Sequence, residues 1–277
     1  MIIVKIALFL WDFRKLKQLI MKKGYFVLMI LSLVFFGCKK TEPVPPVTAA
    51  DFIDPLFFGY MQMNYDTNND FVFQQEEIAA VKELDLAKEN YIVNLKGLEK
   101  FTELELLRVK GLKLQTKNLK ISNGKLKKLY CGEIGLTDLD VSDLTQLELL
   151  SCHENNLTIL DLNNNPNLRN LYCQNNTSLN NINIRDCLKL TFLWVEGCPL
   201  NSLDLSNNPD LEEIYFTVDR FWELDITNNS NLKVAKIERP WPEYGTFKIY
   251  ITQAQSEIFK NYADPESPYF KVLYIVK

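Results

Sequence analysis

The 277-residue sequence is poor in histidine, glycine and basic charge: it has one histidine, ten glycines and a formal net charge of −4. A single histidine excludes an HExxH metal motif, and neither a GxSxG nucleophile turn nor a glycine-rich phosphate loop occurs. The chain also lacks the basic footprint of nucleic-acid-binding proteins. The sequence therefore predicts no enzyme, no required cofactor and no nucleic-acid partner, although its many acids leave a glycosidase-like carboxylate pair open.

Leucine, in contrast, recurs at a near-constant interval. Lines of leucines begin at positions 21 or 22 residues apart: Leu104, Leu126, Leu147, Leu168, Leu190, Leu211 and Leu232. A unit this short cannot bury its own apolar edge and must stack on its neighbours, so the period predicts a solenoid. A solenoid presents an extended surface rather than a catalytic cleft.

Each coil consists of two nested half-repeats. The first half follows L-x-x-L-x-L/C-x-x-N-x-L over residues 147–157, and the second half repeats the rule with one extra residue over 157–168. From about Val81 to Ile237 this pattern resembles the bacterial leucine-rich repeat proteins of the short nested, IRREKO-like type, LxxLxCxxNxLxxLDLxxN. The resemblance implies a leucine-rich repeat solenoid with parallel short strands on both halves of about seven coils.

The register of the repeat also sorts the polar and sulfur-containing residues. Strand side chains alternate between the two faces, so Cys131, Cys152 and Cys173 are predicted to form an inward column of free thiols. Cys187 and Cys198 occupy turn positions where other coils have asparagine. A disulfide within the column or between these two remains open. Five asparagines are expected to satisfy buried backbone groups of adjacent coils: Asn155, Asn165, Asn176, Asn208 and Asn229.

The outward positions of the first-half strands are rich in aromatic residues. Exposed rings on a rigid face are candidate hot spots for a protein partner or stacking platforms for a sugar, although the same rings also stabilise a sheet by packing on each other. Cys152 and His153 are expected to point to opposite faces, which excludes a thiol–imidazole pair. The candidate ligand-binding face consists of Tyr130, Tyr172, Trp194, Tyr215, His153 and Phe192.

Residues 51–83 precede the repeat and read as helix, polar loop, helix, the layout of an EF-hand. Ca²⁺ prefers oxygen ligands, and the loop offers them at six of the usual positions. Phe71 stands where a glycine is normally needed for positive φ, so a capping turn without a metal is the alternative. The Ca²⁺ ligands would be Asp66, Asn68, Asp70, the Val72 carbonyl, Gln74 and Glu77.

The N-terminus carries an export signal. A basic start at Met21 to Lys23 is followed by an apolar run to Phe36 and by Gly37-Cys38, a small-residue cleavage point. The apolar run is shorter than the about 20 residues of a membrane-spanning helix. Residues 34–38 resemble a bacterial lipobox, which implies lipidation of Cys38 and anchoring to the membrane; a non-lipidated exported protein is the alternative. The region before Met21 is interpreted as a start codon called too early, with a cytoplasmic tail as the alternative.

The function hypothesis is a non-catalytic, monomeric lipoprotein of the cell envelope, on the periplasmic side of the outer membrane or on the cell surface. Its repeat face would bind a protein or a glycan. A structural envelope component without a discrete ligand is the alternative. The predicted organisation is a mis-called start (1–20), a signal peptide (21–37), a Pro-containing tether (38–50), an EF-hand-like cap (51–83), the solenoid (84–239) and an α/β C-terminal cap (240–277).

Overall fold

The computed structural model describes residues 45–218, 220–238, 245–259 and 270–277, which belong to one compact unit, Pro45–Lys277. The predicted start, signal peptide and lipidated Cys38 lie outside the described residues. Within the described ranges no helix is both long and apolar enough to cross a membrane.

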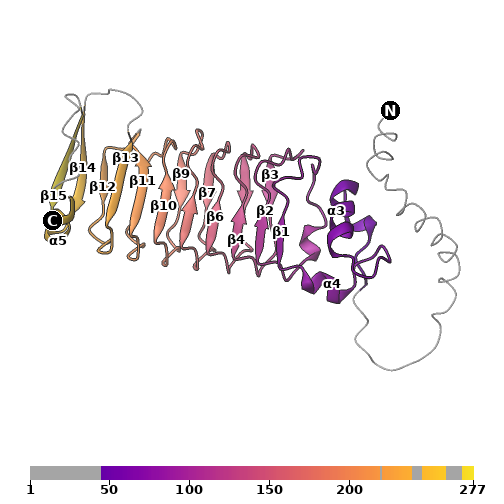
Figure 1. Cartoon of the computed structure of the whole chain (residues 1–277). Helices are drawn as coiled ribbons and strands as arrows, with labels where there is room; N and C mark the ends of the chain where they lie inside the picture. The colour runs from indigo at the N-terminus through magenta and orange to yellow at the C-terminus, as the bar shows by residue number, and fades with distance from the viewer. Residues whose placement is uncertain (1–44, 219, 239–244, 260–269) are drawn as a thin grey trace. The chain divides into compact units, whose positions relative to one another are not determined.

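The predicted solenoid is confirmed: short parallel strands stack coil upon coil (Figure 1). The first-half strands form one eight-stranded parallel sheet, because each three-to-five-residue strand bonds the strand of the next coil. In spatial order they are β1 (Glu83–Asp85), β2 (Leu106–Arg108), β4 (Lys128–Tyr130), β6 (Leu149–Ser151), β8 (Asn170–Tyr172), β10 (Phe192–Val195), β11 (Glu213–Thr217) and β13 (Val234–Glu238).

The second-half strands pair in shorter parallel groups rather than in one continuous sheet. They are β3 (Asn118–Lys120) with β5 (Asp138–Asp140), β7 (Ile159–Asp161) with β9 (Asn181–Asn183), and β12 (Glu223–Asp225) with β14 (Gly245–Ile251) and β15 (Phe270–Val276). The second half of the coil at 201–206 forms no strand. The prediction of strands on both halves therefore holds, with interruptions on the second side.

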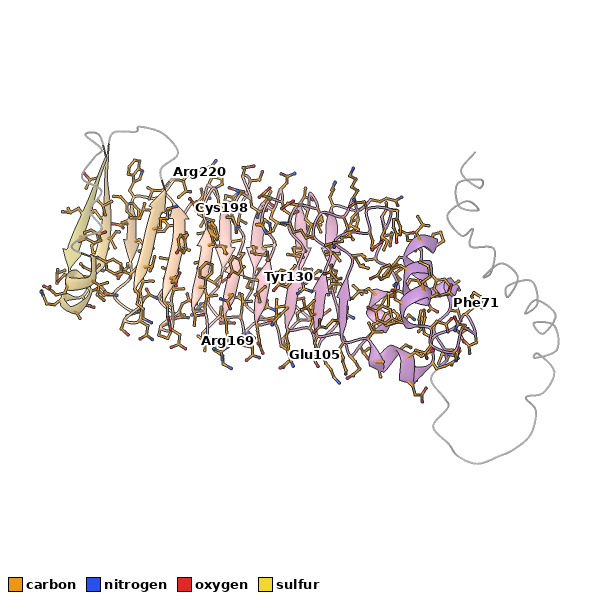
Figure 2. All side chains as sticks on the ribbon, viewed as in Figure 1. Phe71, Glu105, Tyr130, Arg169, Cys198 and Arg220 are labelled. Atoms are coloured by element: carbon orange, nitrogen blue, oxygen red, sulfur yellow. The ribbon has the colours of Figure 1, made fainter. Side chains whose placement is uncertain are left out.

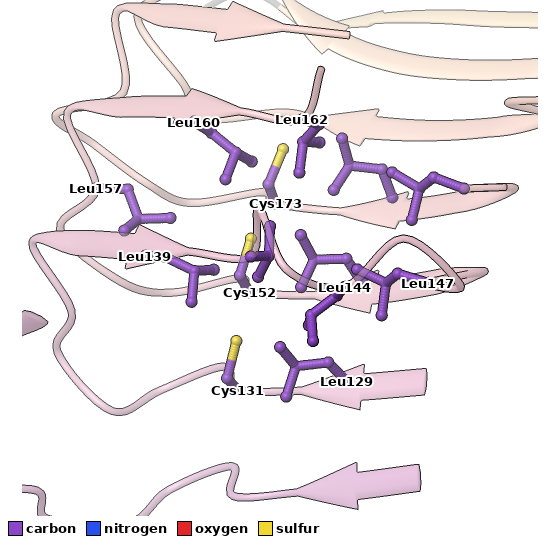
Figure 3. Packing of buried hydrophobic residues seen from close by; sticks show 14 of the residues in the cluster. Leu129, Cys131, Leu139, Leu144, Leu147, Cys152, Leu157, Leu160, Leu162 and Cys173 are labelled. Carbon is purple, nitrogen blue, oxygen red and sulfur yellow. The ribbon is translucent and has the colours of Figure 1, made fainter. Parts of the chain in front are cut away.

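The core lies between these two rows of strands. The central residue of the first-half strands is an aliphatic residue in register from coil to coil, as in Leu84, Leu107 and Leu129, and each of these three is 0% exposed. Cys131, Cys152 and Cys173 follow the strands and form the predicted buried column (Figure 3). All five described cysteines are free. Burial raises the pKa of the Cys131 thiol to about 12.

Two ladders of polar side chains run along the turns, as the sequence predicts for the asparagines. In the first ladder, Asn155 donates to the carbonyls of Cys131 (2.9 Å) and Cys152 (3.0 Å) and accepts from the amides of Ile134 (3.2 Å) and Leu136 (2.9 Å). Asn176 and the thiol of Cys198 continue this ladder. One asparagine side chain thus joins two successive coils.

In the second ladder the asparagine Nδ2 groups again donate to backbone carbonyls, but the Oδ1 atoms of three asparagines accept no hydrogen bond. Asn208 donates to the carbonyls of Ile184 (3.1 Å) and Cys187 (2.9 Å), and the Cys187 thiol lies 3.5 Å from the Leu162 carbonyl. The Oδ1 atoms of Asn165, Asn208 and Asn229 are buried without a hydrogen-bond partner. Cys187 and Cys198 therefore belong to different ladders, each replacing an amide as a weak donor.

Helices close the N-terminal end. Asp54 caps α3 (Pro55–Tyr65) by accepting from Leu56 N (2.9 Å), and its other oxygen accepts from Val93 N (2.7 Å). The hydroxyls of Tyr60 and Tyr65 donate to backbone carbonyls of β1, which ties α3 to the first strand of the sheet. The second helix, α4, spans Gln75–Ala80. These bonds and the buried rings beneath α3 shield the apolar end of the stack.

The tether prediction of 38–50 is wrong at its C-terminal end. Val47 is 6% exposed and forms an antiparallel bridge with Phe73, with bonds of 3.0 and 2.8 Å. Thr48 caps the short helix η2 (Ala49–Asp51). Val47 is an apolar residue among prolines, and its side chain is buried against the cap. The described residues 45–50 therefore belong to the folded unit.

The C-terminal cap continues the solenoid with strands 25 residues apart in the sequence. The region predicted as an α/β C-terminal cap contains β14, α5 (Gln253–Phe259) and β15. Gln255 is 1% exposed and donates to the carbonyls of Ile226 (2.8 Å) and Asn229 (2.9 Å). A glutamine on a helix thus supplies the last rung of the second ladder.

The first ladder yields a stability prediction. Asn155→Ala leaves buried carbonyls and amides without partners, so we expect it to lower the free energy of unfolding by about 3 kcal/mol. The exposed neighbour Asn156 provides the control, and Asn156→Ala should change stability by less than about 0.5 kcal/mol. Urea unfolding monitored by circular dichroism measures both variants. Equal stability of the two would contradict the role of the ladder.

The buried thiols yield a second prediction. Because the thiolate is the reactive form and burial disfavours it, the five described cysteines should not react with Ellman's reagent in the native protein at about pH 8. They should all react in urea. Mass spectrometry of the alkylated native protein assigns any modified position, and modification of Cys131, Cys152 or Cys173 would show that the column is accessible.

Candidate binding face

The outer face of the eight-stranded sheet carries the predicted column of outward residues. Strand register places Arg108 beside Tyr130, then Ser151, Tyr172, Trp194, Tyr215 and Lys236 in successive coils. Figure 2 labels Tyr130 among the stacked strands. Neighbouring strands of a sheet lie about 4.8 Å apart, so adjacent rings in this column are within contact distance.

Four aromatic residues meet on this face, and we call them the aromatic cluster: Tyr172, Phe192, Trp194 and Tyr215. Phe192 is central, with ring centroids 4.8 Å from Tyr172 and 5.7 Å from Tyr215. Trp194 lies 5.5 Å from Tyr215 and 6.5 Å from Tyr172. The rings are tilted to each other and each is half-buried. Part of each ring therefore packs on its neighbours while the rest faces solvent.

Carboxylates hold the polar ends of two rings. Trp194 Nε1 donates to Glu196 (2.7 Å), and the Tyr215 hydroxyl donates to Glu213 (3.3 Å). Glu196 also pairs with Lys236 at 3.7 Å. Burial raises the pKa of Tyr172, which keeps its hydroxyl neutral. These contacts fix ring orientations before any ligand arrives and so reduce the entropy lost on binding.

The predicted face is not one continuous strip. Ser151 stands between Tyr130 and Tyr172 in the register, and the guanidinium of Arg108 lies 5.1 Å from the Tyr130 ring centroid. Tyr130 therefore packs with a cation on the N-terminal side of Ser151. Of the six residues predicted for the face, four form the aromatic cluster, whereas Tyr130 and His153 lie outside it.

His153 belongs to a polar group that the sequence analysis missed. Its Nδ1 lies 3.0 Å from Ser151 Oγ, and its Nε2 lies 3.3 Å from a Glu133 oxygen that also pairs with Lys110 at 2.7 Å. Serine, histidine and glutamate in a row resemble a nucleophilic triad, but Ser151 is 6% exposed, so a substrate could not reach its hydroxyl. Cys152 is buried on the opposite side of the strand, as predicted.

The EF-hand-like loop follows α3 at the N-terminal cap, where Phe71 is labelled in Figure 2. Phe71 has φ +68°, the left-handed conformation for which glycine is normally used, and its amide donates to Asp66 (3.0 Å). Asn68 and Asp70 accept from amides two residues later in the loop. The backbone thus makes the turn that the glycine would allow, at the steric cost of a left-handed phenylalanine.

The acidic side chains of this loop are arranged unequally. Glu77 is 6% exposed, and donors from Thr67 and Gln74 hold its pKa below the usual value although burial alone would raise it. Asp66 is 8% exposed, and its Oδ1 is buried without a hydrogen-bond partner.

Away from the cap loop, three side chains could share a metal ion. Among the described residues, the only three His, Cys, Asp or Glu side chains whose ligand atoms lie within 4.8 Å of one another are Glu133, His153 and Glu154.

Solved structures of two proteins from Listeria monocytogenes str. 4b F2365 are similar to this chain. One is an internalin (inlF), with a TM-score of 0.55, 20% identity, and coverage of 85% of this chain and 79% of that chain. The other is an internalin C2 (inlC2), with a TM-score of 0.54, 14% identity, and coverage of 85% and 100%. At this identity the likeness supports the repeat fold alone. No protein-family model and no curated protein matches the sequence.

Proposed function

We propose that this protein is a binding protein whose aromatic cluster recognises a protein partner. The observation that carries the proposal is the cluster itself: four contacting, partly exposed rings on one face of a rigid parallel sheet. Binding hot spots in protein interfaces are enriched in tryptophan and tyrosine and concentrate in such groups. Isolated cross-strand pairs of rings would stabilise the sheet equally well. Sheet stability alone therefore does not require four rings to lie together in adjacent coils.

The location of the face also supports binding. The rings project from strands whose backbones are bonded on both sides, so a partner would meet fixed side chains. Carboxylates at 2.7 and 3.3 Å from the Trp194 and Tyr215 polar atoms surround the rings with hydrogen-bonding groups. An apolar centre with a polar rim is the usual composition of a protein interface. A glycan remains the second ligand class, because sugars also stack on exposed rings.

We further propose that the chain acts outside the inner membrane as a lipoprotein anchored through Cys38. The support is in the sequence: a basic start, a short apolar run and the Gly37-Cys38 pair. Removal of residues 1–37 takes away six basic residues and one acid, which leaves 25 basic and 34 acidic residues and a formal charge of −9. Radiolabelled palmitate incorporation in the wild type but not in Cys38→Ser tests the anchor.

A double variant tests the aromatic cluster. We expect Trp194→Ala with Tyr172→Ala to keep the circular dichroism spectrum of the wild type but to bind its partner at least about 30-fold more weakly, because about 2 kcal/mol is lost with a hot-spot ring. The partner is first isolated by pull-down with the wild-type protein, and surface plasmon resonance then compares affinities. A glycan array probed with both proteins distinguishes the second ligand class.

Trp222→Ala is the matched control, since Trp222 is 42% exposed but precedes a second-half strand. It should bind the partner with wild-type affinity. If the double variant binds as tightly as this control, the rings serve only sheet packing. If every protein captured by the wild type is also captured by the double variant, the result would favour the alternative of a structural envelope component without a discrete ligand.

A specific observation favours a second binding function, Ca²⁺ binding by the cap loop. The buried Oδ1 of Asp66 lacks a partner, and a cation would supply one. Asp66, Asn68, Asp70, the Val72 carbonyl, Gln74 and Glu77 would hold the ion, which suits a hard cation that takes six to eight oxygens. Asp70 now accepts from Gln74 (2.8 Å) and Glu77 from Thr67 (2.7 Å), so both carboxylates must turn to reach the ion.

Rearrangement and the left-handed Phe71 predict weak affinity, with Kd of about 0.1–1 mM. At about 10 mM Ca²⁺ the free energy of unfolding should then rise by about 1.4–2.7 kcal/mol. Thermal unfolding with Ca²⁺ or Mg²⁺ measures the shift. Asp66→Asn should remove it, whereas Glu76→Gln, which alters an exposed neighbour outside the ligand set, should retain it. No shift in the wild-type protein would mean that the loop is only a capping turn.

A further inference from the structure

We propose that Glu133, His153 and Glu154 form a surface binding site for a divalent transition metal ion, with Zn²⁺ as the best match. Their ligand atoms lie within 4.8 Å of one another, so side-chain rotations can bring them to the about 3.4 Å that separates tetrahedral ligands of one Zn²⁺. The site is separate from the aromatic cluster and from the cap loop, and the proposal does not rest on either of the functions proposed above.

The histidine ring is held in an orientation that suits coordination. Ser151 Oγ lies 3.0 Å from Nδ1, and Ser151 itself is 6% exposed and cannot easily turn away. Nε2 faces Glu133 Oε1 at 3.3 Å. Metal-binding histidines commonly use one ring nitrogen for the ion and bond the other to a protein group that fixes the ring. Ser151 is such a group for Nε2 coordination.

A glycine makes room for this ring. A Cβ atom at Gly132 would lie 2.5 Å from His153 Cε1 and 2.7 Å from Nδ1, which is closer than side-chain atoms normally approach. The position of Gly132 is occupied by His153 on the next coil and by Gln174 on the coil after that. The ring therefore lies flat over a position that the chain leaves without a side chain, and its direction toward Glu133 is fixed by packing as well as by the Ser151 hydroxyl.

The two glutamates stand on successive coils at the same turn position. Glu133 has φ +59° and Glu154 has φ +53°, and the backbone amide of Glu133 donates to the His153 carbonyl at 3.0 Å. Equivalent turn positions hold Gly111, Asn175 and Gly197, residue types that tolerate positive φ better. Glutamates in this conformation thus flank the histidine one strand spacing apart. The Glu154 carboxylate is exposed and has no ion-pair partner among the described residues.

The donor set selects the class of ion. One imidazole nitrogen and two carboxylate oxygens suit Zn²⁺ and its neighbours in the first transition row, with water completing a tetrahedron. Ca²⁺ and Mg²⁺ prefer sites made of oxygen alone. The described thiols are buried in the core and are not available as competing ligands.

The ammonium of Lys110 competes with a metal ion for the Glu133 carboxylate. This ammonium lies 2.7 Å from Glu133 and lowers the pKa of that carboxyl, so the carboxylate is already charged but is occupied by a cation. A metal ion must displace this ammonium. Removing the lysine charge should therefore strengthen metal binding, which a purely structural ion-pair network would not predict.

Zn²⁺ titration of the full-length protein by calorimetry, with Ca²⁺ present throughout, tests the site. We expect one Zn²⁺ per chain, an affinity loss of more than about 100-fold in His153→Ala, and a loss of about 10-fold in Ser151→Ala. Lys110→Gln should bind more tightly than the wild type. Glu212→Gln removes a carboxylate that pairs with Lys233 elsewhere on the surface and should bind Zn²⁺ as the wild type does.

NMR gives a second readout that does not depend on the variants. The chain has one histidine, so a single set of imidazole nitrogen signals reports the site, and Nε2 rather than Nδ1 should shift on Zn²⁺ addition. If His153→Ala misfolds, Glu154→Gln replaces it, because that side chain is exposed. Unshifted imidazole signals at millimolar Zn²⁺, or an affinity in Glu154→Gln equal to that of the wild type, would overturn the proposal.

Discussion

The rest of the structure depends on the way each coil satisfies the backbone of the next. Parallel strands supply part of this bonding, but the turns also hold buried amides and carbonyls that would cost about 1–3 kcal/mol each if left without side-chain partners. Asn155 and Asn176 each bond the backbone of two successive coils, and Gln255 on α5 bonds the carbonyls of the coil before it at the end of the stack. Leucine burial drives the stacking, whereas the amides determine the register at which coils can stack.

That fixed register has consequences for the outer face. Because every coil is locked to its neighbours, residues 21 or 22 positions apart become side-by-side neighbours without any loop to position them. The rings of Tyr172, Trp194 and Tyr215 meet in this way. Glu133 and His153, which are 20 residues apart, meet where the turns of the same two locked coils lie side by side. Groups of side chains on such a sheet are preorganised by the core beneath them, so a ligand would meet little conformational cost.

Sequence periodicity was sufficient for the fold but not for all contacts of the face. Inward leucines, the column at Cys131 and the asparagine rungs follow from the strand alternation and the repeat length. The Ser151–His153–Glu133 row was not predicted, because residues 20 apart become partners only when the turn geometry of both coils is known. Val47 was missed for a related reason: its partner Phe73 lies in the irregular loop, where no period assigns neighbours.

Repetition makes each coil a reference for the others. Where most coils agree, as at the inward leucines, the residue needs only a structural explanation. The coils around β4 and β6 depart from that agreement at several adjacent positions: Ser151 replaces a ring, Gly132 replaces a side chain, and glutamates replace glycine or asparagine at left-handed turns. Stability alone does not favour these departures, since glycine or asparagine adopts positive φ at lower cost. Their coincidence around one imidazole argues that this part of the face was shaped by a ligand.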